Sequence, residues 1–146
     1  PMKQKVGPLV ETLLGHGWMV QLETNGEEWV DLPDSEDLDI ICSPKSDHVH
    51  TFVKSRATCW RYMIREADEY ERRDGLPVCN TQKIDGSRVA VAKPTRGRPV
   101  WLQPVTEDGS TDKNTRATKS RAMEYGYRYA GPRMLERGRV TDRLLD

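Results

Sequence analysis

The stretch from Leu38 to Glu71, LDIICSPKSDHVHTFVKSRATCWRYMIREADEYE, decides how the rest of the chain can fold. Its first five residues are a compact apolar run, which indicates an inner β-strand. A polar turn follows, and the alternation from His48 to Lys54 predicts a second strand. Apolar residues then recur at helical spacing from Ala57 to Arg73, which predicts an amphipathic helix. The apolar stripe of that helix consists of Trp60, Met63, Ile64 and Ala67.

Further elements are predicted on both sides of this stretch. Residues 6–17 carry one apolar stripe and end in glycines, which is typical of a helix. Asn25-Gly26 lies between two β-type runs and predicts a hairpin of residues 18–22 and 28–32. Three later runs predict strands at residues 76–79, 88–93 and 100–105. The C-terminal segment predicts two short helices broken at Gly131-Pro132.

This order of elements predicts an α/β fold, with a mixed central β-sheet flanked by helices and a C-terminal helical extension. With 146 residues, one main domain is expected. We assign residues 1–106 to an α/β domain and residues 107–146 to a basic linker and helical extension.

The amino-acid composition limits the cellular location and the kinds of partner that we expect for this protein. The chain has no apolar run of about 18 residues, so no membrane span is expected. Its N-terminus lacks the apolar region of a signal peptide. Three widely spaced cysteines fit a reducing cytoplasm better than a disulfide framework. Residues 11–50 are strongly acidic and residues 51–146 carry twenty basic against thirteen acidic side chains, a distribution that suits a phosphate-rich partner or mutual neutralisation within the fold.

Asp39 at a strand start and Lys54 at a strand end, after a helix that carries Glu11, form a pattern that resembles the PD-(D/E)XK nuclease superfamily, particularly the archaeal-type Holliday junction resolvases. The resemblance covers residues 6–93. It implies that Glu11 and Asp39 bind Mg²⁺ and that Lys54 activates the attacking water. Phe52 stands where the family has an acid, and His50 on the same strand face is the candidate replacement ligand.

The resemblance implies DNA as the partner, with Mg²⁺-dependent cleavage of duplex or branched DNA. Basic residues at the expected strand–helix junction would contact the phosphates. Arg-Gly-Arg-Pro at residues 96–99 also resembles an AT-hook, although a basic loop explains it equally well. The expected DNA contacts are Lys54, Arg56, Arg61, Arg96 and Arg98.

Other interpretations remain open at this point. Asp39 and Lys54 also fit the roles of a turn carboxylate and a solvated strand end. His48 and His50 share a strand face, a spacing that some zinc sites use. The chain could instead be a structural or interaction protein, such as a virion component, a phage accessory protein or an inhibitor whose acidic surface mimics nucleic acid. Apolar residues in the C-terminal extension favour a homo-oligomer.

Overall fold

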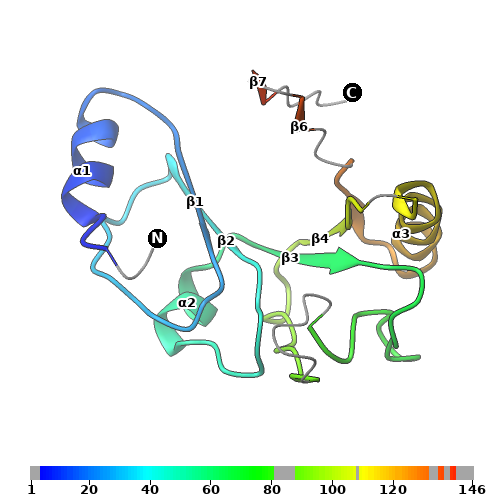
Figure 1. The fold of residues 1–146 in the computed structure, drawn as a ribbon. Helices are drawn as coiled ribbons and strands as arrows, with labels where there is room; N and C mark the ends of the chain where they lie inside the picture. The colour runs from blue at the N-terminus through cyan, green and yellow to red at the C-terminus, as the bar shows by residue number, and fades with distance from the viewer. Residues whose placement is uncertain (1–3, 81–87, 108, 132–134, 137–138, 141–146) are drawn as a thin grey trace.

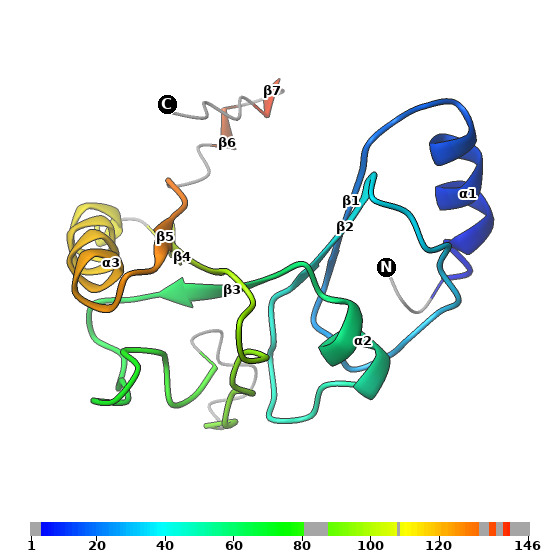
Figure 2. The ribbon, with the colours of Figure 1, turned by 180° about the vertical axis from the view of Figure 1, so that it is seen from behind.

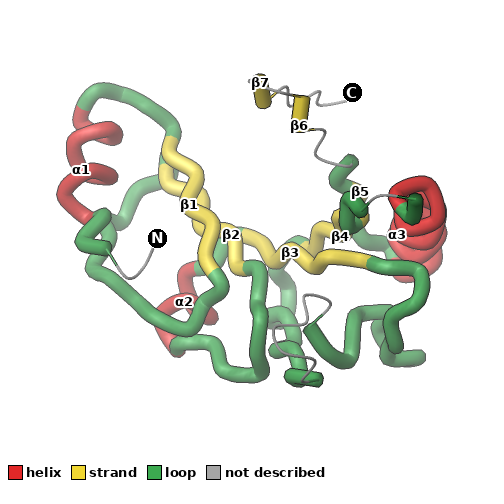
Figure 3. Tube along the Cα trace, viewed as in Figure 1, coloured by secondary structure: helices red, strands yellow, loops and turns green. Residues whose placement is uncertain are grey.

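The computed structural model describes residues 4–80, 88–107, 109–131, 135–136 and 139–140. These residues form an α/β fold around a five-stranded sheet in the order β1-β2-β3-β4-β5, and each pair of neighbouring strands is parallel (Figures 1 and 3). The strands are β1 Val20–Thr24, β2 Leu38–Cys42, β3 Cys59–Ile64, β4 Val100–Pro104 and β5 Arg128–Tyr129. The helices are α1 Gly7–Gly15, α2 Thr51–Arg56 and α3 Thr111–Tyr125. A short antiparallel pair, β6 Leu135–Glu136 and β7 Arg139–Val140, follows.

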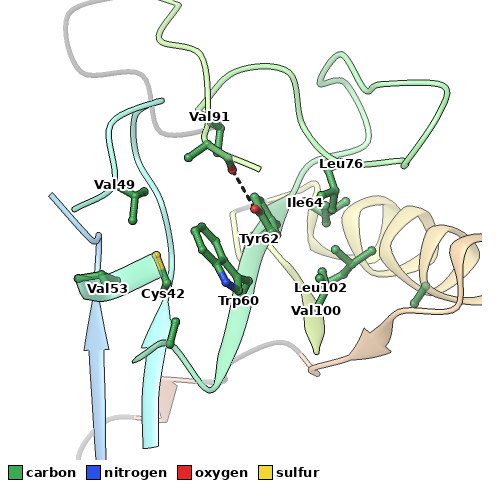
Figure 4. Close-up of a cluster of buried hydrophobic side chains, with 13 residues drawn as sticks. Cys42, Val49, Val53, Trp60, Tyr62, Ile64, Leu76, Val91, Val100 and Leu102 are labelled. Carbon is green, nitrogen blue, oxygen red and sulfur yellow. Dashed lines mark hydrogen bonds between the residues drawn. The ribbon is translucent and has the colours of Figure 1, made fainter. Parts of the chain in front are cut away.

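Strand β3 defines the core because its side chains alternate strictly between two faces of the sheet. Trp60, Tyr62 and Ile64 are buried, and the residues between them are half-buried. Neighbouring residues in register on parallel strands point the same way, so Cys42 of β2 and Leu102 of β4 join the same face. Figure 4 shows these side chains gathered beneath the loop that carries Val91.

A second buried cluster lies under α1, beside β1 at one end of the sheet (Figure 2). It consists of Val10, Leu22, Leu32, Leu38 and Ile40. Pro8 stands in the first turn of α1, where its missing N–H removes no helical hydrogen bond. The helix therefore serves to cover the apolar ends of β1 and β2.

Helix α3 lies at the opposite end of the sheet, against β4 and β5 (Figures 1 and 2). Thr118 and Ala122 form its buried side. Asn114 fixes the start of the helix, because its amide nitrogen donates to the Val105 carbonyl at 3.0 Å and its oxygen accepts from the Glu66 N–H at 2.9 Å. Gly126 ends the helix with a φ of 71° and turns the chain into β5.

The structure confirms the α/β class, the N-terminal helix, the strand at Leu38–Cys42 and the strand that begins at Val100. The sheet is parallel at every described strand pair, whereas a mixed sheet was expected. The expected extension contains one helix, α3, followed by β5, which pairs with β4. The second helix expected after Gly131-Pro132 was wrong for the described residues there, because they form the strand pair β6–β7. The division into residues 1–106 and 107–146 stays a prediction.

Three other predicted elements were wrong. The expected strand at His48–Lys54 is replaced by α2, whose first turn is capped by His50 Nδ1 accepting from the Phe52 N–H at 3.2 Å. The expected helix at Ala57–Arg73 is replaced by β3 and a loop. The hairpin at Asn25-Gly26 is absent, because β1 pairs in parallel with β2 and residues 28–32 form no strand.

Residues 76–79 and 88–93 form isolated antiparallel bridges, Tyr70 with Pro77 and Cys79 with Ala90, within the long β3–β4 connection. The break expected at Gly131-Pro132 involves Pro132, which lies outside the described residues, as does the turn expected at residues 85–86. No helix in the described parts of the chain has both the length and the apolar character needed to cross a membrane.

Candidate functional site at the carboxyl ends of the strands

The carboxyl ends of β1 to β5 lie at one edge of the sheet, because all their described pairings are parallel. Ligands of open α/β sheets bind at this edge. A shallow pocket opens there between the end of β2, the end of β3 and the β3–β4 connection. It is lined by Ser43, Pro44, Lys45, Tyr62, Met63, Pro77, Cys79, Asn80 and Val91.

The loop after β1 is held against the loop after β2 by hydrogen bonds of both backbone and side chains. The Ser43 N–H donates to the Thr24 carbonyl at 2.7 Å, and the Ser46 hydroxyl donates to Glu27 Oε1 at 3.0 Å. Gly26 has a φ of +85°, and a Cβ there would lie 2.9 Å from a Val49 methyl group. The tight turn therefore requires glycine.

Lys45 is the basic residue that lines the pocket. Its backbone carbonyl accepts from the Asn80 side-chain amide at 3.0 Å, which ties the two walls of the pocket together. Burial lowers the pKa of the Lys45 amine from its ordinary value, since desolvation disfavours the charged form. The Lys45 amine is therefore a partly desolvated hydrogen-bond donor at the pocket.

Tyr62 closes the floor of the pocket. Its hydroxyl donates to the Ala92 carbonyl at 2.8 Å, as the dashed line in Figure 4 shows. Burial, followed by nearby Cys42 and Asp74, raises the pKa of Tyr62 above its ordinary value. The phenol thus stays protonated and anchors the loop that carries Val91 to the sheet.

The sheet face opposite the core carries polar side chains, which we call the polar face. Its members alternate with the core residues along the strands and include Gln21, Glu23, Asp39, Cys59, Arg61, Trp101 and Arg128. Arg61 Nη1 donates to Glu23 Oε1 at 2.7 Å across β2. Burial raises the pKa of the Cys59 thiol, an effect that Arg61 opposes and Asp39 reinforces. Charged groups therefore surround Cys59.

The residues predicted as a metal site do not come together. Glu11 is exposed on α1, Asp39 is exposed on β2, and His50 caps α2. In the described residues no group of three or more His, Cys, Asp or Glu side chains could hold a metal ion. Lys54 is exposed on α2 rather than at a strand end. Within the part of the chain that the structure describes, these residues therefore form no Mg²⁺ site, and His48 and His50 belong to no zinc site of three or more ligands.

The residues predicted to contact DNA mostly bind the protein itself. Arg56 donates to the Leu32 carbonyl at 2.8 Å and to the Pro33 carbonyl at 2.7 Å. Arg98 donates to the Ser55 carbonyl at 3.0 Å, and Arg61 pairs with Glu23. Arg96 and Lys54 are exposed. The strand–helix junction expected to carry Lys54, Arg56 and Arg61 does not form, because Lys54 and Arg56 lie on α2 and Arg61 lies on β3.

Comparison with known proteins first defines the class of fold. The structure of QueE from Escherichia coli matches with a TM-score of 0.56 and 20% identity, over 90% of this chain and 52% of that chain. The likeness establishes the same α/β architecture. No family model matches the sequence.

A curated relative points to a particular protein. The 7-carboxy-7-deazaguanine synthase of Rhodospirillum rubrum is 37% identical over 135 residues, which cover 88% of this chain. The match covers 57% of the relative, so the chain spans little more than half the length of that synthase.

These comparisons overturn the resemblance to PD-(D/E)XK nucleases, which was wrong. The nuclease function, the DNA partner and the phage or virion role were wrong with it, because the similar protein is named for the synthesis of a small molecule. Mg²⁺ as the principal cofactor was likewise wrong, because that prediction rested on the nuclease resemblance, which these comparisons overturn. Glu11, Asp39 and Lys54 matched a short motif by chance, and Phe52, where the family has an acid, was the residue that departed from it.

Sequence reasoning passed over the segments that do meet at the carboxyl edge. Glu23 and Thr24 end β1 and Asn25-Gly26 follows it, and residues 43–45, Ser-Pro-Lys, follow β2. Polar residues that directly follow a buried strand are the signal that could have found them. The hairpin interpretation of Asn25-Gly26 concealed that signal for β1.

Proposed function

We propose that this chain is, or is part of, a 7-carboxy-7-deazaguanine synthase, and that the carboxyl edge of its sheet binds the heterocyclic substrate and the product formed from it, 7-carboxy-7-deazaguanine. The observation that carries the proposal is the 37% identity to the Rhodospirillum rubrum synthase over 135 residues. The fold shared with QueE of Escherichia coli supports it.

The chemistry of the carboxyl edge suits a small polar heterocycle, although the pocket itself holds only about 10 Å³, room for about one water molecule. The pocket combines apolar walls from Met63, Pro77 and Val91 with polar groups from Ser43, Lys45 and Asn80. Small-molecule sites are mostly concave and apolar, with a few placed polar groups that fix orientation. The pocket and the adjoining polar face offer both donors and acceptors, as a guanine-like ring requires.

The cellular location of the protein is part of the same proposal. We place it in the cytoplasm, in line with three free cysteines at positions 42, 59 and 79. Within the described residues, none of the three belongs to a group of three or more His, Cys, Asp or Glu side chains that could hold a metal ion. The chemistry proposed for this chain is binding and orientation of the substrate.

Production of 7-carboxy-7-deazaguanine in an Escherichia coli strain that lacks QueE tests the proposal. The chain would be expressed in that strain and the compound measured in cell extracts by mass spectrometry. We expect the compound to reappear, and a Lys45→Ala variant with normal expression to reduce its amount. Absence of the compound, in a strain where plasmid-borne Escherichia coli QueE restores it, would contradict an activity of this chain by itself.

A further inference from the structure

The polar face of the sheet is unusual for parallel strands. Parallel sheets normally carry covering layers on both faces, and their strands are then apolar throughout. Here Gln21, Asp39 and Arg128 are exposed on that face, and Glu23 and Arg61 are half-buried. Met63 of β3 alternates onto this face and is also among the residues that line the pocket.

On this face, the Arg61 side chain has a buried hydrogen-bond donor without an acceptor in the described part of the chain. Its side chain is 15% exposed, and Nη1 is occupied by Glu23 Oε1 at 2.7 Å. Its Nε atom is buried and has no hydrogen-bond partner among the described residues. A buried donor without an acceptor is unfavourable. An oxygen ligand on the Nε side of the guanidinium would satisfy it.

The surroundings of Arg61 suit a flat, negatively charged ligand. Trp101 of β4 is the register partner of Arg61, so both side chains stand on the same face. Arg128 lies over the Trp101 ring, with 5.5 Å from its guanidinium carbon to the ring centroid. The face therefore combines two guanidinium groups with an aromatic wall, while Glu23 holds Arg61 in place.

We infer that Arg61 binds the carboxylate of the heterocyclic ligand through its Nε edge, with Glu23 as the residue that positions it and Trp101 as a wall for the ring. The inference rests on the proposed function, since the compound named in the relative's activity carries a carboxylate on a guanine-like ring. A planar guanidinium matches the two oxygens of a carboxylate, which a lysine ammonium does not.

Calorimetric titration of the 146-residue chain with two probes, 7-carboxy-7-deazaguanine and 7-deazaguanine, tests the inference. For Arg61→Gln we expect about a 10- to 100-fold loss of affinity for the carboxylated probe, the range for a charge-assisted contact. Affinity for 7-deazaguanine should change less than about threefold. Arg61→Lys keeps the positive charge but loses the planar guanidinium, so its affinity for the carboxylated probe should lie between those of wild type and Arg61→Gln. Arg116→Gln removes the same charge from the exposed side of α3 and should bind like wild type.

The outcomes separate the two proposals. If wild type binds the carboxylated probe and both Arg61 variants, shown to be folded by circular dichroism, bind it equally well, the Arg61 inference is wrong and the proposed function stands. An equal loss for both probes in Arg61→Lys also overturns it, because the residue would then be structural. If wild type binds neither probe, the substrate site proposed under the function fails, and the Arg61 inference fails with it.

Discussion

Glu23 on β1 and Arg61 on β3 meet across the intervening strand β2, with 2.7 Å between Oε1 and Nη1. The two residues are 38 positions apart in sequence, and only the parallel order of three strands brings them to the same face. The pair links the first strand to the centre of the sheet and fixes the orientation of the guanidinium.

Glu23→Gln should weaken both the fold and the site. Loss of the carboxylate leaves a mostly buried guanidinium with a weaker acceptor, so the free energy of unfolding should fall by about 1–2 kcal/mol. Urea denaturation followed by tryptophan fluorescence measures this change. Glu11→Gln, the same change at an exposed residue of α1, is the matched control and should change stability by less than about 0.5 kcal/mol. A Glu23→Gln variant as stable as wild type would show that the Glu23–Arg61 ion pair does not contribute to the free energy of unfolding.

Gly75→Ala should destabilise the protein more than the same change at Gly97. Both glycines have positive φ, +66° and +81°, so alanine is strained at both by about 1–2 kcal/mol. A Cβ at Gly75 would also collide with the Tyr125 ring, whereas a Cβ at Gly97 meets nothing within 4 Å. Thermal unfolding of the two variants should therefore give a clearly lower Tm for Gly75→Ala. Equal Tm values would mean that Tyr125 does not pack where the structure places it.

Tyr62→Phe should loosen the loop that carries Val91. The substitution removes the buried hydrogen bond to the Ala92 carbonyl and leaves that acceptor unsatisfied, at about 1–2 kcal/mol. Amide hydrogen exchange should accelerate at residues 90–92, because Ala92 N–H and Val91 N–H bind Ser46 and Val78 in the same loop contact. Tyr125→Phe, whose hydroxyl makes an exposed 3.3 Å bond to Arg72, is the control and should leave exchange there unchanged. If amide exchange at residues 90–92 were unchanged in Tyr62→Phe, the Tyr62 hydroxyl would not anchor this loop.

Alkaline pH should destabilise the fold through Cys42. Burial, and then nearby Cys59, raises the pKa of the Cys42 thiol from 9.0 to about 12. Between these values the unfolded thiol ionises while the folded one stays protonated, so rising pH favours unfolding. Buried Tyr62 and Tyr70 act in the same direction, since their pKa values are also raised, and Lys45 opposes them because its pKa is lowered.

A comparison of wild type with Cys42→Ala isolates the contribution of the thiol. Between about pH 8 and about pH 10, wild type should lose about 1 kcal/mol more unfolding free energy than Cys42→Ala. Urea titrations at both pH values measure the difference. Identical pH dependence in the two proteins would show that Cys42 ionises as easily in the folded state as in the unfolded state.

The sequence correctly predicted those helices and strands whose local residue pattern fits only one type of secondary structure. Leu38–Cys42 is apolar at four of five positions and lies between turns, and this pattern predicts an inner strand. The N-terminal helix shows one apolar stripe bounded by glycines. Both predictions rest on short-range periodicity, which the tertiary structure did not override.

The prediction failed where two periodicities fit the same residues. Trp60 and Ile64 are four apart, as on a helix face, and they also lie on one face of a strand together with Tyr62. Pairing with β2 and β4 decided for the strand, and that pairing is invisible in the local pattern. The candidate site was missed for the same reason, because Glu23, Ser43 and Arg61 become neighbours only through the parallel register.

The central claim is that the carboxyl edge and the polar face of this sheet bind 7-carboxy-7-deazaguanine. Titration of ¹⁵N-labelled protein with this compound, followed by amide chemical shifts, tests it most directly. We predict saturable shifts at Glu23, Ser43, Lys45, Arg61 and Met63, with the amides of α1 unchanged. No shift at saturating compound, or shifts confined to α1 and α2, would contradict the claim.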